Sequence, residues 1–402
     1  MATTTPSEKK AIAAVPLPTM PFDTARLDEL LDKAGLDAVL VTSKHNIQYM
    51  LGGYRYFFYA NMDAHGLSRY LPCLVYIKGR PQDTTYIASP MEDYERELGK
   101  FWMDSTHFGN MTSRQTAATA VATLRRCAPH VRRFGIETSF LPLDAYEVLR
   151  DGLPGASFAS ATLPLELLRA VKTPGELKTI EDASTKVVEA MLAAIGHHGA
   201  GATKADIADD LRVEETARGV TFDYCLITMG RSFNRAPSGQ AWRDGDVLSL
   251  DSGGNIGGYI GDLCRMAILG EPDAELEDLL AEIDAIQMAA RKPVRAGARG
   301  ADVFAGPEAL LARSPHRDML DFVAHGMGIV SHEAPWLTAR SAVPYEAYHA
   351  DRPLEAGMVL SIETTLLHAR RGFIKLEDTV AVTETGWTAF GDAGRGWNRG
   401  RD

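Results

Sequence analysis

Residues 247–265, VLSLDSGGNIGGYIGDLCR, contain two apolar segments that each carry an aspartate. Asp251 ends the first apolar run, and Asp262 lies in the second. The glycine pairs at 253–254 and 257–258 predict a tight hairpin turn between two strands. An unpaired carboxylate is costly inside an apolar strand, so both aspartates are expected to have a partner.

Three further polar residues lie downstream in short, recognisable sequence segments. His325 opens the glycine-rich segment HGMGIVSHEAP, Glu363 ends the apolar run GMVLSIE, and Glu377 lies in KLEDTV. Four carboxylates and one imidazole form a hard, mostly oxygen ligand set that suits Mn, Fe, Co or Zn. Two such ions about 3.5–4 Å apart can hold a bridging hydroxide and polarise a carbonyl group. The sequence therefore predicts a two-metal site, whose ligands are Asp251, Asp262, His325, Glu363 and Glu377.

Composition restricts the class of protein. The chain has 402 residues, of which 45% are hydrophobic and 24% charged, as in an ordinary globular protein of two to three domains. A net charge of −11 argues against a nucleic-acid surface. The four cysteines are widely spaced without a CxxC pattern, which favours reduced thiols. No run of about 18 apolar residues predicts a transmembrane helix, and no secretory signal is recognisable, so we expect a cytoplasmic protein without a membrane partner.

The first part of the chain alternates helical and strand patterns. Residues 1–20 read as a flexible arm, and the expected first domain covers 21–165. It begins with a helix in which Leu27, Leu30 and Leu31 share one face, and Gly35 ends it. Further strands are expected at 37–43, 74–77, 85–88 and 133–136, and helices at 114–126 and 143–150. This alternation predicts an α/β layer fold.

The second domain, expected at 166–402, starts with a sequence pattern that is typical of a helix N-terminus. Thr173 is placed as the N-cap, Pro174 as the first helical residue, and Glu176 completes a capping box. The helix should run to about residue 195. Two more helices are expected at 204–218 and 275–292, around the strands that carry the predicted ligands. The fold class is therefore mixed α/β (α+β).

The five ligand contexts, in this order, resemble the catalytic domain of metallopeptidase family M24. This is the pita-bread fold of methionine aminopeptidase, aminopeptidase P and prolidase, and the resemblance covers roughly residues 165–390. The segment LRAVKTPGEL at 168–177 is similar to the start of that domain in prolidase-type proteins. Residues 22–160 resemble the N-terminal domain of the creatinase and prolidase branch. The resemblance implies a creatinase-type α/β domain followed by a pita-bread catalytic domain.

The resemblance also implies roles for the ligands. Asp251 binds one metal ion, whereas Asp262 and Glu377 bridge both. His325 and Glu363 each bind one ion. The implied cofactor is a pair of divalent ions, manganese among the candidates.

The resemblance further implies a hydrolytic mechanism for a small substrate such as an Xaa-Pro dipeptide. Glu363 doubles as the base that takes a proton from the nucleophilic water. His332 is not a ligand but donates a hydrogen bond that stabilises the oxyanion. A metal-bridged hydroxide then cleaves a C–N amide bond.

Three positions depart from the peptidase pattern. The loop at 230–238 lacks the substrate-contacting histidine of these peptidases, and Asn234 or Arg235 stands nearest to its place. The usual Glu-Pro-Gly is Glu363-Thr-Thr, and the usual arginine before the last glutamate is Lys375. Arg235 is suited to bind an anionic group of a substrate.

Three interpretations of the function remain. The first is a peptidase with altered loops. The second is a non-peptidase of the same fold that acts on a small zwitterion, as a dimethylsulfoniopropionate lyase or an ectoine- or creatine-type hydrolase does. The intact ligand set argues against the metal-free creatinase mechanism. The third is a non-catalytic binding module, which five ligands and His332 disfavour.

Aromatic residues supply further candidates for the substrate pocket. In creatinase-like dimers, a loop matching the run at 54–59 reaches the active site of the partner. We therefore expect a homodimer in which Tyr56, Phe58 or His65 shapes the partner's pocket, although core packing is the alternative. Trp336 and Arg340 are candidates for the pocket wall.

Overall fold

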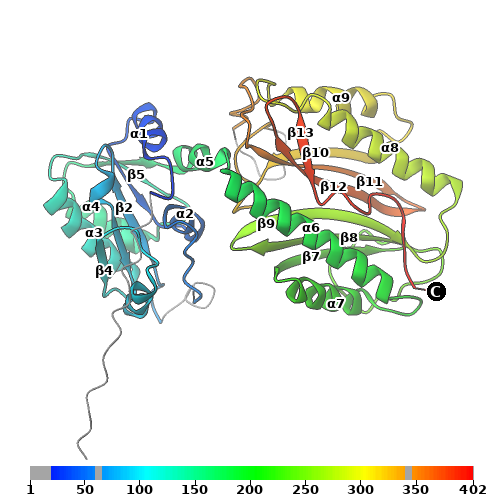
Figure 1. Cartoon of the computed structure of the whole chain (residues 1–402), viewed down its shortest axis with the longest axis horizontal. Coiled ribbons are helices and arrows are strands. Elements are labelled where there is room, and N and C mark those ends of the chain that lie inside the picture. Colours follow the sequence, from blue (N-terminus) through cyan, green and yellow to red (C-terminus); the bar gives the residue numbers. More distant parts are fainter. Residues whose placement is uncertain (1–19, 59–65, 340–345, 402) are drawn as a thin grey trace, which may run out of the picture. The chain divides into compact units, whose positions relative to one another are not determined.

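The computed structural model of the chain describes residues 20–58, 66–339 and 346–401. The chain divides into two compact units, Met1–Leu165 (unit 1) and Glu166–Asp402 (unit 2), and the division falls within helix α5 (Thr162–Ala170) (Figure 1). The arm expected at 1–20 lies outside the described residues except for its last position. In the described part of the chain, no helix has both the length and the apolar composition needed to cross a membrane.

Unit 1 is built on a mixed six-stranded sheet with the order β4-β3-β2-β1-β5-β6. The β1–β2 and β2–β3 pairs are antiparallel, and the others are parallel. The strands are β1 (Ala38–Val41), β2 (Cys73–Ile77), β3 (Thr85–Ala88), β4 (Ser105–Phe108), β5 (Arg133–Ile136) and β6 (Ser157–Ser160). The helices are α1 (Thr24–Lys33), α2 (Lys44–Met50), α3 (Ser113–Cys127) and α4 (Leu143–Gly152), with 3-10 segments η2 (Pro81–Asp83) and η3 (Pro90–Leu98).

Local sequence signals determined most elements of unit 1. The Asp23 side chain caps α1, and the three leucines predicted to share a face are buried. Gly35 follows the helix with φ of +67°, a left-handed conformation that favours glycine. The expected first helix is thus confirmed, as are the strands now labelled β1, β2, β3 and β5 and the helices α3 and α4.

Unit 2 is built on an eight-stranded sheet. Its main path is β10-β11-β12-β9-β8-β7, while β13 pairs with β12 and β14 pairs with β9. The strands are β7 (Thr221–Met229), β8 (Val247–Ile256), β9 (Tyr259–Ile268), β10 (Leu320–Gly326), β11 (Val359–His368), β12 (Gly372–Val382), β13 (Trp387–Phe390) and β14 (Asn398–Arg399). The helices are α6 (Pro174–His197), α7 (Lys204–Ala217), α8 (Ala274–Arg291) and α9 (Asp302–Leu311). The capping box predicted at Thr173 is present at the start of α6.

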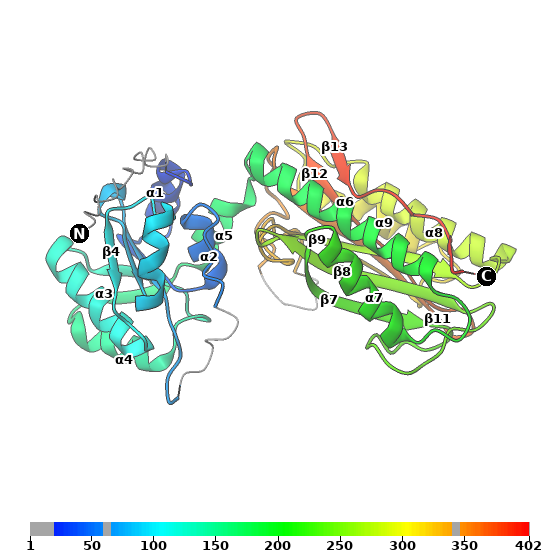
Figure 2. The same ribbon diagram turned by 60° about the horizontal axis from the view of Figure 1, so that its bottom comes forward.

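The helices of unit 2 cover the sheet in two pairs. Helices α6 and α7 pack on β7, β8 and β9, whereas α8 and α9 pack on β10, β11 and β12 (Figure 1, Figure 2). Leu250 and Leu263 lie in the core under α6, and Leu376 lies in the core under α8. Because side chains alternate between the faces of a strand, the residues next to these leucines point to the face without these helices. Asp251, Asp262 and Glu377 occupy such positions.

The hairpin between β8 and β9 is shorter than the sequence indicated. Ile256 pairs with Tyr259, so the turn consists of the glycines at 257 and 258, whose φ values are +56° and +88°. The expectation that 253–254 also belongs to the turn was wrong, because both glycines are paired within β8. A Cβ at Gly253 would lie 2.2 Å from the Tyr224 ring, so packing explains this glycine.

We predict that Gly261→Ala destabilises unit 2. A Cβ at position 261 would lie 2.7 Å from the backbone nitrogen of Ser184 in α6, so the helix would have to move away from β9. The expected loss in the free energy of unfolding is about 1–3 kcal/mol. The matched control is Gly196→Ala, an exposed site in α6 with nothing within 4 Å, where helix propensity predicts a gain of up to about 1 kcal/mol. Calorimetric unfolding of both variants tests this, and equal effects would contradict it.

Candidate metal centre

Five polar side chains meet on the helix-free face of the large sheet, one from each of five neighbouring strands. In the sheet order β10-β11-β12-β9-β8 they are His325, Glu363, Glu377, Asp262 and Asp251. Glu363 pairs directly with Glu377, and Asp251 and Glu377 flank strand β9, which carries Asp262. The structure therefore brings together all five residues that were predicted as ligands.

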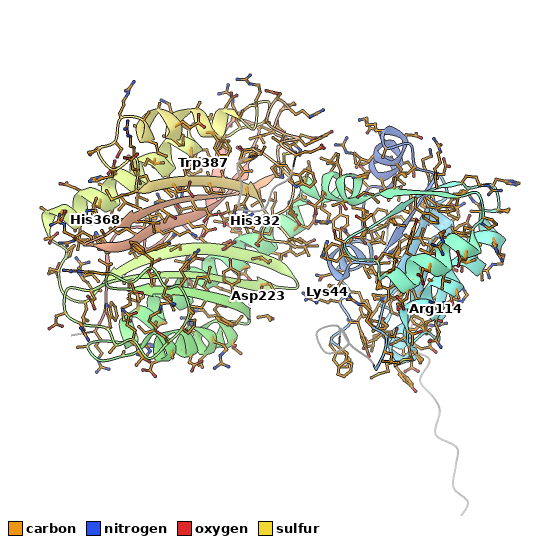
Figure 3. The ribbon with its side chains drawn as sticks, turned by 180° about the vertical axis from the view of Figure 1, so that it is seen from behind. Lys44, Arg114, Asp223, His332, His368 and Trp387 are labelled. Atoms are coloured by element: carbon orange, nitrogen blue, oxygen red, sulfur yellow. The ribbon has the colours of Figure 1, made fainter. Side chains whose placement is uncertain are left out.

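A cavity of 740 Å³ opens over this cluster. Four of the five residues line it, and His325 lies behind His332, whose ring stacks on it with centroids 3.8 Å apart. Figure 3 shows His332 at the end of the large sheet opposite to His368. Apolar side chains supply another part of the wall, namely Leu226, Val323, Leu367 and Phe373. The volume lies within the range of about 300–1,000 Å³ that is typical of small-molecule sites.

The donor atoms fit a divalent cation. Ligand atoms of Asp262, His325 and Glu377 lie within 4.8 Å of one another, and all three residues are buried. The Nδ1 atom of His325 lies 3.1 Å from the carbonyl oxygen of Gly326, which can only accept, so Nδ1 carries the proton. The Nε2 atom is buried and makes no hydrogen bond with any described residue. Burial opposes charge on His325, but Glu363, at 3.4 Å from Nε2, and Asp262 raise its pKa, so a metal ion at Nε2 would take the place of a proton there.

Two basic side chains neutralise part of the cluster. Lys375 is buried, and its Nζ atom lies close to three carboxylates, at 2.7 Å from Asp251, 2.7 Å from Glu363 and 2.8 Å from Glu377. Arg235 donates a hydrogen bond to Asp251 from the cavity wall. Among the described residues, no lysine or arginine pairs with Asp262, the fourth carboxylate.

Because the charged groups of the cluster lie close together, the pKa values of its carboxyl groups differ widely. Burial and a neighbouring aspartate raise the pKa of Asp262 to about 6. Burial, and then Asp262 and Glu363, raise the pKa of Glu377 well above its usual range. Burial also opposes charge on Glu363, but Lys375 and His325 outweigh it and hold the pKa of Glu363 below its usual range. Two raised pKa values indicate excess negative charge, which a divalent cation would relieve.

Two hydroxyl groups that sequence reasoning missed also contact the cluster. The Tyr224 hydroxyl donates a hydrogen bond to Asp262, and the Ser361 hydroxyl donates one to Glu377 over 2.9 Å. The signal for Tyr224 was the glycine at position 253, which leaves room for the tyrosine ring across the β7–β8 pair. No comparable signal pointed to Ser361, which is a common residue in a strand.

A buried ionic network fixes the loop that carries His332. The next residue, Glu333, lies 3.1 Å from Arg169 and 2.9 Å from Lys172, and all three side chains are at most 2% exposed. Glu333 also accepts a hydrogen bond from the backbone of Val330. Burial, followed by the charge of His325, lowers the pKa of His332 to about 4. His332 is therefore a neutral imidazole at pH 7.

The other predicted pocket residues have different positions. The Asn234 side chain accepts a hydrogen bond from the backbone of Ala236 within its own loop, and the described residues lining the cavity do not include it. Trp336 packs against the core under α8 and α9 and likewise does not line the cavity. Arg340 lies outside the described residues.

The aromatic run of unit 1 is only partly described, because residues 59–65 lie outside the described residues. Tyr56 is buried beside Tyr70 in a small cluster of unit 1, and Phe58 packs at its edge. Phe57, by contrast, is 72% exposed. The homodimer with composite sites stays a prediction.

The Asp378 side chain lies on the opposite face of the sheet. It is buried among Arg265, Arg291 and Arg395, with the first two at 3.0 and 2.8 Å. Arg265 also donates a hydrogen bond to the backbone carbonyl of Glu377 over 2.9 Å. These contacts turn Asp378 away from the cluster and make it a residue that orients strand β12.

A second histidine and carboxylate group lies at the surface. His197 of α6 lies near Asp210 and Glu214 of α7. The histidine is hydrogen-bonded to Asp210, and Glu214 pairs with Arg218. Both carboxylates already have partners at the surface, so the buried cluster is the better metal site.

Family models match both parts of the chain. Residues 177–384, more than half of the 402 residues, match the model described as metallopeptidase family M24. Residues 24–171 match the model of the creatinase/prolidase N-terminal domain.

Individual relatives span nearly the whole chain. The uncharacterized peptidase YqhT of Bacillus subtilis is 23% identical over 367 residues, which cover 90% of this chain and 95% of the relative. The Xaa-Pro dipeptidase of Pyrococcus horikoshii is 22% identical over 373 residues, covering 90% and 94%. A solved structure of an Xaa-Pro dipeptidase from Bacillus anthracis matches with a TM-score of 0.75 at 20% identity, covering 94% of this chain and 98% of the other. At this identity, the structural likeness establishes the fold alone.

We predict that Glu333→Gln strongly destabilises unit 2. The variant keeps the shape of the side chain but leaves Arg169 and Lys172 buried without their shared carboxylate, which costs about 3–5 kcal/mol. The control is Glu181→Gln, which breaks an exposed pair with Lys178 and should cost less than about 1 kcal/mol. Urea unfolding measures both values. A small loss for Glu333→Gln would show that the network does not support the loop.

Acid should destabilise unit 2 through His349. Burial and then Arg352 lower the pKa of His349 to about 4, and its Nδ1 atom accepts a hydrogen bond from the Trp336 backbone over 2.9 Å. Because the folded pKa lies below the unfolded value of about 6.5, stability is complete above pH 6.5 and is lost as the pH falls toward 4. One such group contributes about 3 kcal/mol. Unfolding of chelator-treated wild type and His349→Asn across this range should show a shallower pH dependence in the variant; identical curves would refute this.

Proposed function

Because the chain belongs to metallopeptidase family M24 and is a metal-dependent hydrolase, we propose that it cleaves the C–N amide bond of a small substrate such as an Xaa-Pro dipeptide. The family matches confirm the two-part fold that the sequence resemblance implied. One observation carries the proposal: four candidate ligands and His332 line a single cavity. Relatives named Xaa-Pro dipeptidase span most of this chain and support the substrate class.

We assign five residues as the ligands of two divalent ions. Asp262 and Glu377 stand in the middle of the strand order, which suits them to contact both ions. Asp251 stands on one side, and His325 and Glu363 stand on the other. When bound, the ions lower the pKa of water and polarise the substrate carbonyl. Manganese is one candidate among the metals that accept this oxygen-rich set.

Glu363 transfers the proton, and His332 stabilises the charge that develops on the carbonyl oxygen. Glu363 stays ionised because Lys375 and His325 hold its pKa low, so it can accept a proton from the attacking water. It then returns this proton to the leaving nitrogen. Neutral His332 lines the cavity and donates an N–H to the carbonyl oxygen as negative charge develops there.

Arg235 and the apolar wall position the substrate. The guanidinium of Arg235 lies over the Phe373 ring at 5.4 Å, and its side chain is 37% exposed while it pairs with Asp251. It therefore presents further N–H groups to the cavity, where a substrate carboxylate can bind. Leu226, Val323 and Leu367 offer apolar surface to a proline ring or an aliphatic side chain.

A small zwitterion that is not a peptide is the second candidate substrate. The observation in its favour is Arg235, a cation that lines the cavity, together with the aspartates at 318 and 321, which also line it. The loop at 230–238 contributes Arg235 and no histidine to the cavity. Opposite charges on the wall suit a substrate that carries both charges.

Turnover on two substrate panels tests the proposal. We predict that manganese-loaded protein hydrolyses Xaa-Pro dipeptides, that a chelator abolishes the activity, and that added manganese restores it. Asp262→Asn should abolish turnover because it removes a ligand placed between both ions. Asp206→Asn, an exposed change in α7 outside the cavity, serves as the control.

The two panels separate the candidate substrates. Cleavage of dipeptides alone supports the peptidase. Turnover of zwitterions alone, such as ectoine, creatine or dimethylsulfoniopropionate, overturns the dipeptide proposal and favours the second candidate. Activity that survives Asp262→Asn would contradict the metal centre itself.

A further inference from the structure

Two histidines and two carboxylates meet where the end of α6 lies beside α7, and none of them lines the cavity of the candidate metal centre. The two helices lie side by side (Figure 1, Figure 2). His197 is the last residue of α6, and His198 follows it with an extended backbone, at φ −111° and ψ 146°. Asp210 and Glu214 are four residues apart on α7, so they point to the same side of that helix. One helix–helix connection thus brings four candidate ligands together.

The distances between the donor atoms fit a single ion. The Oδ2 atom of Asp210 lies 2.9 Å from Nδ1 of His197 and 3.3 Å from Nε2 of His198. The Oε1 atom of Glu214 lies 4.0 Å from Nδ1 of His197. Ligand atoms bound to a tetrahedral zinc ion at about 2.0–2.1 Å are about 3.4 Å apart, which lies within this range of separations. Small movements of the side chains would therefore complete the coordination.

One of the imidazoles has an incomplete set of contacts. The Nε2 atom of His198 is buried and faces Asp210, but it makes no hydrogen bond with any described residue. A metal ion placed between Nε2 and Oδ2 would bind both atoms. The side chains of His198, Asp210 and Glu214 are 21%, 23% and 19% exposed, so the group is more enclosed than an ordinary surface ion pair.

The partners that the two carboxylates already have do not close this position. Arg218 donates a hydrogen bond to Oε2 of Glu214, whereas Oε1 is the atom that faces His197. Arg218 also lies 3.8 Å from Glu189, so a further carboxylate offsets its charge. The hydrogen bond between His197 and Asp210 would be replaced by bonds from both side chains to the same ion. Two carboxylates balance the charge of one divalent ion.

We propose that His197, His198, Asp210 and Glu214 form a second metal site, a structural zinc site that ties the end of α6 to α7. Two imidazoles favour zinc over manganese, whereas the buried centre offers one imidazole among four carboxylates. The ion would also support the last residues of the described chain, because the carbonyl oxygen of His198 accepts a hydrogen bond from the backbone of Arg401 over 2.6 Å. This site is independent of the proposed function and goes beyond it.

Binding of Zn²⁺ to the full chain, made without a histidine tag, tests the inference. Protein stripped with a chelator is titrated with Zn²⁺ against a chromophoric chelator, and thermal unfolding is followed with and without the ion. Because the buried centre also takes metal, the titration is repeated in Asp262→Asn. In both backgrounds His198→Gln should remove one zinc ion from the stoichiometry or weaken its binding at least about tenfold. It should also reduce the zinc-dependent rise in unfolding temperature by at least about 5 °C at a free zinc concentration about a hundredfold above the dissociation constant.

A second variant and a matched control separate metal binding from other roles of the histidine. Asp210→Asn removes a ligand charge from α7 and should weaken the same ion at least about tenfold. The control is His316→Gln, because His316 forms a similar contact with Glu282 over 2.7 Å, with side chains 27% and 24% exposed, but belongs to no metal-binding group among the described residues. This control should keep every zinc ion. Each variant is compared with its own metal-free unfolding temperature, so a change in intrinsic stability is not counted as loss of zinc.

Two outcomes would overturn the inference. One is a His198→Gln protein that binds and is stabilised by zinc as the wild type is, and the other is an equal loss in His316→Gln. Asp262→Asn distinguishes this failure from failure of the proposed function. A zinc ion that remains in Asp262→Asn and is lost with His198→Gln supports the second site, whatever the substrate of the enzyme is. If Asp262→Asn binds the same amount of zinc with and without His198→Gln, the second site is refuted and the buried centre is unaffected.

Discussion

The burial of four carboxylates on one face of one sheet is the constraint on which the catalytic unit depends. Asp251, Asp262, Glu363 and Glu377 come from four neighbouring strands, and mutual repulsion would push them apart in a dry environment. Lys375 binds three of them, the Tyr224 hydroxyl binds the fourth, Asp262, and the Ser361 hydroxyl also binds Glu377. The negative charge that remains makes the site selective for a cation.

The opposite face of the same sheet supplies the rigidity that this arrangement requires. Helices α6 to α9 pack on apolar residues that alternate with the site residues along each strand. Beneath the centre, Asp378 is held by three arginines, and Arg265 also binds the backbone at Glu377. The ligands are therefore carried by strands whose positions are fixed from behind, which keeps charged side chains in place at small separations.

The centre and the substrate groups are stabilised by different means. The proposed metal ligands stand on strands, whereas His332 stands on a loop and depends on Glu333, Arg169 and Lys172 for its position. Arg235 also stands on a loop and is oriented by Asp251 and the Phe373 ring. Change in the loops can therefore alter the substrate while the metal chemistry on the strands is retained. The absence of a histidine from the loop at 230–238 is consistent with such a change.

The sequence by itself determined the local elements and the identity of the candidate ligand set. The capping box at Thr173 and the apolar runs ending in Asp251 and Glu363 are local signals, and their structural outcome matches them. Only the tertiary structure decided what lies around those ligands. In the sequence, Lys375 was interpreted only as a replacement of the family's arginine. Nothing in the sequence around Tyr224 indicated its contact with Asp262. Gly253 was wrongly assigned to a turn. The physical reason is that each of these roles depends on strand register across the sheet, which brings together residues far apart in the chain.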